Sequence, residues 1–131
     1  MATDIIDRYY EEHSVYKSLI ICEDESTAIE LVTALREKDY TVTAILDDDI
    51  HDDRPRFMSV LQNWGVDMER VLVTTYYVIF NQQRLFKLYV LPDQNLIVFY
   101  NLDHNMSRVI VQYLEDCERS GFMESVNILS V

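Results

Sequence analysis

Acidic side chains are the groups that, by type and spacing, could most readily bind a metal ion or take part in a reaction. Glu23, Asp24 and Glu25 directly follow an apolar run, and five aspartates lie in residues 47–53. Carboxylate oxygens at the end of a strand are ligands that Mg²⁺ and Ca²⁺ prefer. Aspartate is also favoured in turns and at the first residues of helices. A solvated acidic loop is therefore the simpler interpretation of residues 47–53, with weak binding of a divalent cation as the alternative.

Histidine and cysteine are the remaining candidates for metal or nucleophilic chemistry. They occur at His13, His51, His104, Cys22 and Cys117. Their spacing matches no metal-binding motif and no catalytic triad. Both cysteines fall within apolar patterns, where a thiol behaves as a small buried hydrophobic group. The sequence therefore predicts no catalytic residue, no metal site and no cofactor.

Apolar runs alternate with helical patterns along the chain, which predicts an α/β domain with a mostly parallel sheet. Strands are expected at residues 18–22, 40–46, 70–75, 96–100 and 126–129. Helices are expected at residues 4–12, 26–39, 54–63 and 105–119, with Ile29 and Val109 among their core-facing side chains. The uninterrupted run Val71-Leu72-Val73 predicts a strand buried on both faces at the centre of the sheet. Residues 85–91 are expected to form an extra strand or hairpin arm.

The length and composition indicate one globular domain, residues 1–131, with 49% hydrophobic and 26% charged residues. The formal net charge of −12 argues against direct binding of nucleic acid, whose phosphates would be repelled. The first four residues do not start a secretory leader, and no apolar run reaches the length of a transmembrane helix. We therefore expect a cytoplasmic protein without a membrane contact.

One segment resembles the first strand and acid pair of bacterial receiver domains, namely Ile20-Ile21-Cys22-Glu23-Asp24-Glu25. This resemblance would imply Mg²⁺ bound by the acids. The later strand that should carry a phosphate-accepting aspartate ends instead in Val73-Thr74-Thr75, and the expected lysine is missing as well. The chain therefore departs from that family at its functional positions.

A second resemblance, to the C-terminal RecA-like domain of DEAD-box RNA helicases, extends over nearly the whole chain. The matching pieces are Asp4–Glu11, Ser18–Cys22, Leu35–Val42, Arg54, Val71–Thr75 and Phe99–Leu102. Val71–Thr75 is similar to the Val-Leu-Ile-Thr-Thr that opens the fifth motif of that family. The order and spacing of the pieces are more specific than any one of them. The resemblance implies a RecA-like fold with helices on both faces of the sheet.

The departures from this family fall on its functional positions. Tyr76 stands where the family has an aspartate, and no Arg-Gly-x-Asp occurs between Tyr76 and Leu91. The arginine-rich sixth motif falls on residues 111–118, where Glu115 and Glu118 occupy arginine positions. Such arginines stabilise charge on a transferred phosphoryl group. The whole chain has two glycines, whereas phosphate-binding loops need glycine for close backbone approach. ATP hydrolysis is therefore not expected.

Aromatic residues crowd the segment that replaces the family's ligand-binding loop. We expect some of them to form an exposed interaction surface, composed of Tyr76, Tyr77, Phe80, Phe86 and Tyr89. The function predicted is a non-catalytic, degenerate helicase-like module for protein interaction or self-association as a homodimer. The resemblance would place it in a larger scaffold, as in Tudor-domain (Yb-type) proteins of small-RNA ribonucleoprotein granules. The alternative is a residual RNA- or nucleotide-binding domain that works with a second RecA-like domain.

Overall fold

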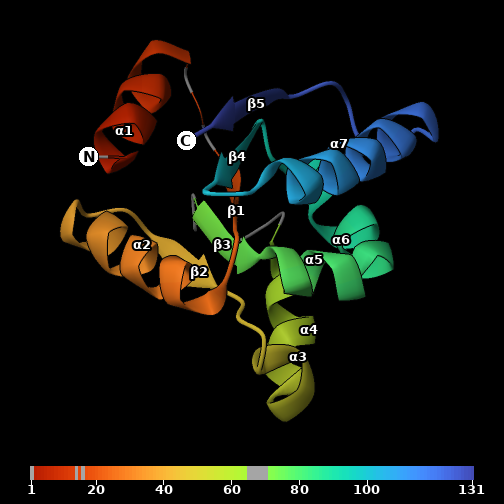
Figure 1. The fold of residues 1–131 in the computed structure, drawn as a ribbon. Coiled ribbons are helices and arrows are strands. Elements are labelled where there is room, and N and C mark those ends of the chain that lie inside the picture. The colour runs from red at the N-terminus through yellow and green to blue at the C-terminus, as the bar shows by residue number, and fades with distance from the viewer. Residues whose placement is uncertain (1, 14, 16, 65–70) are drawn as a thin grey trace.

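The computed structural model describes residues 2–131 except 14, 16 and 65–70, and its described part contains a five-stranded parallel sheet (Figure 1). The strands are β1 (Ser18–Cys22), β2 (Val42–Ala44), β3 (Val71–Thr75), β4 (Leu96–Tyr100) and β5 (Asn127–Ser130). Their order is β2-β3-β1-β4-β5. The mostly parallel sheet predicted from the sequence is therefore confirmed.

The strand at the centre of the sheet is β1. The sequence had predicted that β3 lies there, which was wrong. Both strands are buried along their whole length, so burial alone could not rank them. β3 still has a neighbour on each side, because β2 pairs with it at the edge. Ile20 of β1 lies in register with Val73 and with Val98. The expected start of β3 at Arg70 and the glycine at position 65 lie outside the described residues.

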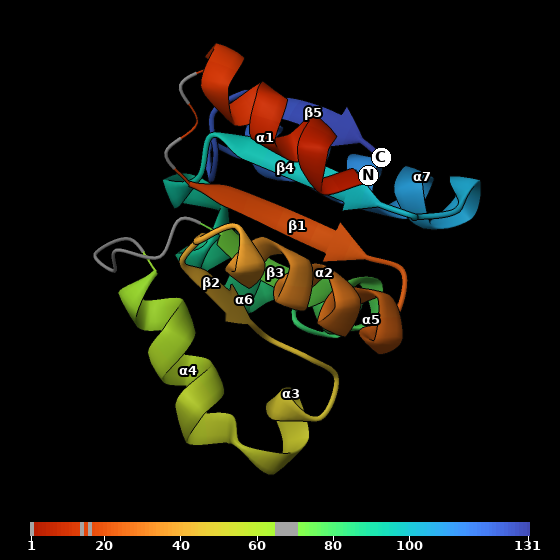
Figure 2. The same cartoon turned by 90° about the vertical axis from the view of Figure 1, so that its left-hand side faces the viewer.

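Helices cover both faces of the sheet (Figure 2). They are α1 (Ala2–His13), α2 (Glu25–Glu37), α3 (Asp49–Asp52), α4 (Arg54–Asn63), α5 (Tyr76–Asn81), α6 (Gln83–Tyr89) and α7 (His104–Arg119). A short 3-10 turn, η1 (Leu91–Asp93), follows α6. α1 and α2 pack on one face, and α4 to α7 pack on the other, so that each face has its own hydrophobic core. No helix among the described residues is long and apolar enough to cross a membrane.

The segment after β3 is helical, which corrects the prediction of an extra strand or hairpin arm at residues 85–91. Thr75 begins α5 as its N-cap, and its hydroxyl accepts a hydrogen bond from the Val78 N–H. Val78, Ile79 and Phe86 are buried against the sheet. A short apolar run can belong to a strand or to a buried helix, and here the helical capping residue at position 75 decides the outcome.

Two of the residues expected in the core are exposed. Ile29 on α2 is 51% exposed and Val109 on α7 is 39% exposed. On α2 the buried stripe is formed by Ala28, Leu31 and Leu35, which places Ile29 beside it. An apolar side chain next to a core stripe often remains partly in solvent, because the stripe that faces the sheet is narrow.

Candidate functional site

The carboxyl end of β3 carries two threonines whose hydroxyl groups are both used inside the fold. Thr74 Oγ1 donates a hydrogen bond to the Ile45 carbonyl at 2.8 Å. Thr75 Oγ1 donates to Asp47 Oδ1 at 2.6 Å and accepts from the Val78 N–H at 3.2 Å. Ligands of open α/β sheets bind just beyond such strand ends. In this chain helix α5 starts there directly, and the polar groups at the strand end already have internal partners.

Helix α5 presents aromatic rings to solvent. The ring of Tyr76 stacks on that of Phe80, with centroids 5.8 Å apart and an angle of 26° between the planes. Tyr77 is 44% exposed and Phe80 is 51% exposed. The Tyr77 hydroxyl lies 3.4 Å from His51 Nε2, which connects α5 to α3. We call Tyr76, Tyr77 and Phe80 the α5 surface.

The other two residues of the predicted interaction surface lie elsewhere. Phe86 is fully buried and belongs to the core, so its assignment to the surface was wrong. Tyr89 is half-buried and packs against the same core. Phe86 points inward because α6 turns one side toward the sheet, while Leu88 on its other side is 42% exposed. Aromatic content alone does not show which side of a short helix is buried.

The acidic residues act mainly as helix caps and loop acceptors. Asp24 caps α2 by accepting from the Thr27 N–H at 2.8 Å, and that bond lowers the pKa of the Asp24 carboxyl. Asp53 caps α4 in the same way, through the Arg56 N–H. Asp49 accepts from the Leu46 N–H at 2.8 Å. Within the described ranges no three histidine, cysteine or acidic side chains are grouped as metal ligands.

Among the described acidic residues, Glu25 has a raised pKa. Desolvation is the largest cause, and the negative charges of Asp48, Asp47 and Asp49 add to it. The side chain is partly buried, and the crowded carboxylates at the ends of β1 and β2 add to the effect of desolvation. Such crowding raises the energy of each charged form. The acidic side chains at the ends of β1 and β2 therefore form a solvated, negatively charged rim.

Residues 111–118, which were compared with the sixth helicase motif, lie on α7, where Glu115 and Glu118 are exposed to solvent. Their neighbour Asp116 accepts hydrogen bonds from Gln112 at 3.1 Å and from Arg119 at 2.6 Å. These contacts are those of a solvated helix face. Glu115, Asp116 and Glu118 give this exposed face a negative charge.

Both cysteines are buried, as predicted. Burial raises the pKa of the Cys22 thiol to about 12, with smaller contributions from Asp24 and Glu23. Burial also raises the pKa of Cys117. Because the thiolate is the nucleophilic form, a raised pKa keeps these side chains unreactive near neutral pH. They behave as packing residues of the two cores.

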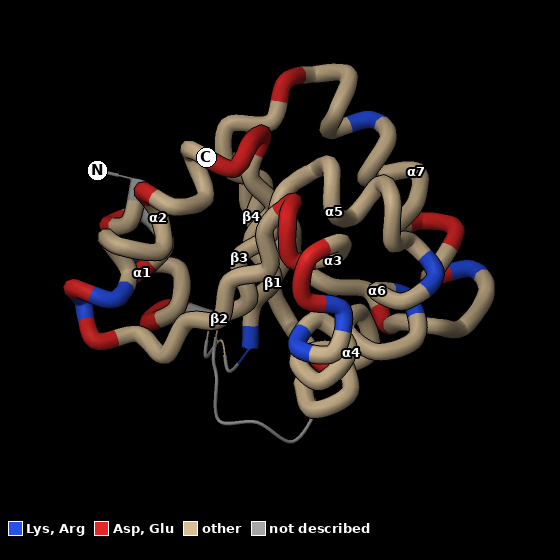
Figure 3. Tube along the Cα trace, turned by 90° about the horizontal axis from the view of Figure 1, so that it is seen from below, with Lys and Arg blue, Asp and Glu red and all other residues tan. Residues whose placement is uncertain are grey.

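A groove that the sequence analysis missed lies between the start of α4 and helix α6. Its volume is about 410 Å³, and its lining includes Arg54, Gln82, Arg84, Leu85, Leu88 and Tyr89. Arg54 donates a hydrogen bond to Gln82 Oε1 at 3.4 Å. Figure 3 shows basic positions on α4 and α6, while acidic positions gather on α1, α2 and the loop before α3. We call this feature the α4–α6 groove.

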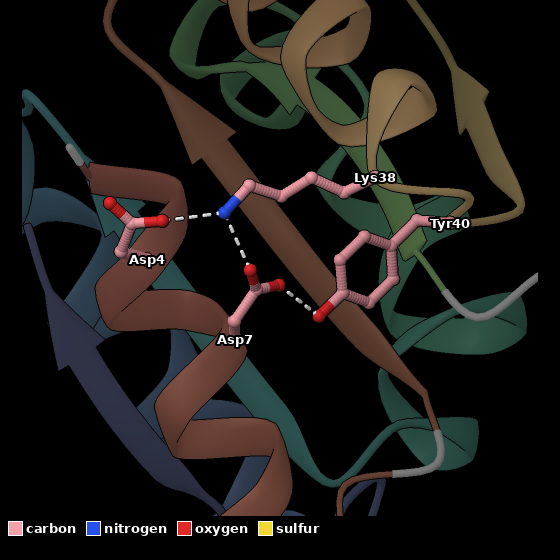
Figure 4. Close-up of polar contacts among 4 residues, drawn as sticks. All are labelled: Asp4, Asp7, Lys38 and Tyr40. Atoms are coloured by element: carbon pink, nitrogen blue, oxygen red, sulfur yellow. Dashed lines mark hydrogen bonds and ion pairs between the residues drawn. The ribbon is translucent and has the colours of Figure 1, made fainter.

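A polar cluster ties α1 to the end of α2 (Figure 4). Lys38 Nζ lies 2.6 Å from Asp4 Oδ1 and 2.6 Å from Asp7 Oδ2. The Tyr40 hydroxyl donates to the other oxygen of Asp7. The hydrogen bond from Lys38 is the largest cause of the lowered pKa of Asp4, and both carboxylates raise the pKa of Lys38. The positive charge of Lys38 is paired with the carboxylates of Asp4 and Asp7, so this cluster holds α1 next to the end of α2.

No protein-family model matches the sequence, and no curated protein sequence matches it. Solved structures do resemble the fold. The helicase domain of Hef from Pyrococcus furiosus superposes with a TM-score of 0.69 at 17% identity, covering 98% of this chain and 24% of that one. The C-terminal part of the Fun30 ATPase domain gives a TM-score of 0.63 at 13% identity, covering 97% of this chain and 38% of that one.

The C-terminal domain of the DEAD-box protein Dbp5 superposes with a TM-score of 0.62 at 20% identity, covering 98% of this chain and 68% of that chain. This chain therefore spans about a quarter of the Hef structure and about two thirds of the Dbp5 structure. The parallel sheet, its two layers of helices and these superpositions agree with one another. The chain has the α/β RecA-like fold of helicase C-terminal domains, as the sequence predicted.

Proposed function

We propose that this chain is a non-catalytic, helicase-like domain that associates with a second copy of itself through the α5 surface. The exposed aromatic rings of Tyr77 and Phe80 carry the proposal. Exposed tyrosine and phenylalanine are enriched in protein interfaces, because a large ring excludes much water at a small cost in conformational entropy. They stand where the resembling helicases have a polar, ligand-binding loop.

The absence of catalysis is supported by what occupies the functional positions. The hydroxyl group of Thr75 is committed to the cap of α5 and to Asp47. The solvent face of α7 carries Glu115 and Glu118 in place of arginines. A phosphoryl-transfer site needs cations close to the phosphate, so this arrangement favours a role that depends on the shape of the domain.

A second copy is the partner that fits the charges around the α5 surface. His51 contacts Tyr77, so residues 51–54 begin at the edge of this surface. Their sequence, His-Asp-Asp-Arg, places both signs of charge side by side. In a twofold interface the same patch meets itself, and the acidic part of one copy can face the basic part of the other. A place in a ribonucleoprotein-granule scaffold stays a prediction from the resemblance.

The test is sedimentation velocity over a range of protein concentrations. We expect the wild-type chain to dimerise and the double variant Tyr77→Ser/Phe80→Ser to dissociate at least about tenfold more readily. Ile29→Ser is the matched control, since Ile29 is as exposed as Phe80, at 51%, but lies on the opposite face of the sheet. A monomer at every concentration, or a dimer that the double variant leaves unchanged, would refute self-association through α5.

A further inference from the structure

The α4–α6 groove carries two arginines, Arg54 and Arg84. Within the described residues neither Arg54 nor Arg84 takes part in an ion pair, and both side chains are exposed. The sequence has 23 acidic residues against 11 basic ones, so a basic side chain has many possible partners. By contrast, Arg56, two residues after Arg54, pairs with Asp49 at 3.3 Å. Two guanidinium groups at one groove, neither in an ion pair within the described part of the chain, suit an anionic ligand.

The same groove also offers apolar surface. Leu88 is 42% exposed, and Leu85 and Tyr89 line the groove while half-buried against the core. The Arg54 guanidinium carbon lies 5.2 Å from the centre of the Phe57 ring, which supports the orientation of this arginine. The groove therefore combines the guanidinium group of Arg54, which lies over Phe57, the guanidinium group of Arg84 on α6, and the apolar surface of Leu85 and Leu88.

We propose that the α4–α6 groove binds a short acidic peptide segment that carries at least one apolar side chain. Carboxylates of the segment bind Arg54 and Arg84, since guanidinium and carboxylate groups form paired, charge-assisted hydrogen bonds. The apolar side chain packs on Leu88 and Leu85. The partner is thus a protein with an acidic, amphipathic motif. Arg54 borders both features, but Tyr77 and Phe80 do not line the groove, so peptide binding and self-association can be tested with separate variants.

The surroundings of the groove favour a peptide over a nucleic acid. Asp52 and Asp53 directly precede Arg54 and are exposed. A strand of nucleic acid carries a phosphate on every nucleotide and needs a continuous basic track, whereas this groove supplies two arginines beside an acidic loop. A peptide with two or three carboxylates can satisfy the arginines and keep its remaining length away from the aspartates. Leu88 would contribute little to a phosphate contact.

Fluorescence anisotropy can test the proposal with a labelled decapeptide in which a Leu-Phe pair is flanked on each side by two glutamates. A matched peptide has glutamine at those four positions. We expect the acidic peptide to bind the full chain, and both the glutamine peptide and Arg54→Gln/Arg84→Gln to weaken binding at least tenfold. Arg108→Gln is the control variant, because Arg108 is also exposed but lies on α7. Thermal unfolding followed by circular dichroism establishes that the variants are folded.

Three outcomes would overturn the proposal. The first is no binding of the acidic peptide up to about 1 mM. The second is binding that the double arginine variant leaves unchanged. The third is tighter binding of a labelled twelve-nucleotide oligo-uridine that is lost in the same variant, which would assign the groove to nucleic acid. Peptide binding by the monomeric Tyr77→Ser/Phe80→Ser variant shows that the groove works even where self-association has failed.

Discussion

Lys38 shows how single residues fix an element to this domain. Its amino group lies 2.6 Å from carboxylate oxygens of both Asp4 and Asp7, which belong to α1. Lys38 itself follows the last residue of α2 and is the C-cap of that helix. An exposed ion pair contributes little on its own, but one cation shared by two carboxylates fixes the rotation of α1 as well as its position. The two aspartates of the helicase-like opening pattern thus serve the packing of α1.

Replacing Lys38 by Met should raise the pKa of Asp4 toward its ordinary value of 3.8, because the hydrogen bond from Lys38 is the main cause of the shift. A carboxyl group with a lowered pKa stabilises the fold above that ordinary value, and this contribution is lost as pH falls through the folded-state pKa. The variant should therefore lose less stability on acidification. A carbon-13 NMR titration of the carboxyl groups measures the change.

Asp24 supplies the internal control for that titration. Its pKa is lowered by the Thr27 N–H at the start of α2, to which Lys38 contributes nothing. The Asp24 curve should coincide in the wild-type and variant chains. If the Asp4 curve also coincides, Lys38 does not hold α1 through this carboxylate.

At the level of elements, Thr75 determines that a helix follows β3. Thr75 is buried, accepts from the Val78 N–H and donates to Asp47, so one hydroxyl starts α5 and secures the acidic loop. Thr75→Ala should lower the free energy of unfolding by about 1–3 kcal/mol, because it removes a cap and leaves Asp47 without this donor. Thr75→Ser keeps the hydroxyl and should lose less. Urea unfolding of the two variants measures the difference, and equal losses would show that the methyl group matters and the hydroxyl does not.

The strands were predictable from the sequence, whereas the helices after β3 were not. Runs such as Leu19–Cys22 and Val71–Val73 have no polar break and are rich in β-branched residues, which favours a short strand buried on both faces. Residues 76–91 mix apolar and polar positions without glycine, and short segments of this kind fit a strand or a helix equally well. Whether this segment forms a helix or a strand depends on the N-cap at Thr75. The sequence alone does not show that Thr75 is a cap, because it also fits the end of a strand.

The candidate sites bring together elements that are distant in sequence, so predicting them requires the packing of the elements as well as their type. Tyr77 and Phe80 were identified because they replace a family loop, but burial of Phe86 follows from the rotation of α6 against the sheet. The α4–α6 groove joins Arg54 to Arg84, and the second arginine lay next to a segment expected to be a strand. Without the helix there is no groove, so its residues could not be grouped from the sequence.

At the scale of the whole molecule, charge is distributed unevenly. Residues 1–53 contain 15 of the 23 acidic residues and 4 of the 11 basic ones. Figure 3 shows the corresponding acidic positions around α1, α2 and the loop before α3. Two copies of a chain with a net charge of −12 repel each other, so association through α5 has to overcome this repulsion. An acidic peptide at the α4–α6 groove is instead attracted locally by Arg54 and Arg84.

Salt should therefore act on the two proposed interactions in opposite directions. Raising NaCl from about 0.02 M to about 0.5 M shortens the screening length from roughly 20 Å to roughly 4 Å. We expect dimerisation to strengthen, because screening removes the repulsion between like-charged copies while aromatic burial persists. Binding of the acidic peptide should weaken over the same range, because its ion pairs are screened. Sedimentation equilibrium and anisotropy in matched buffers give both constants. A dimer that weakens with salt would mean that the facing charges of residues 51–54 contribute more to the interface than the rings of Tyr77 and Phe80 do.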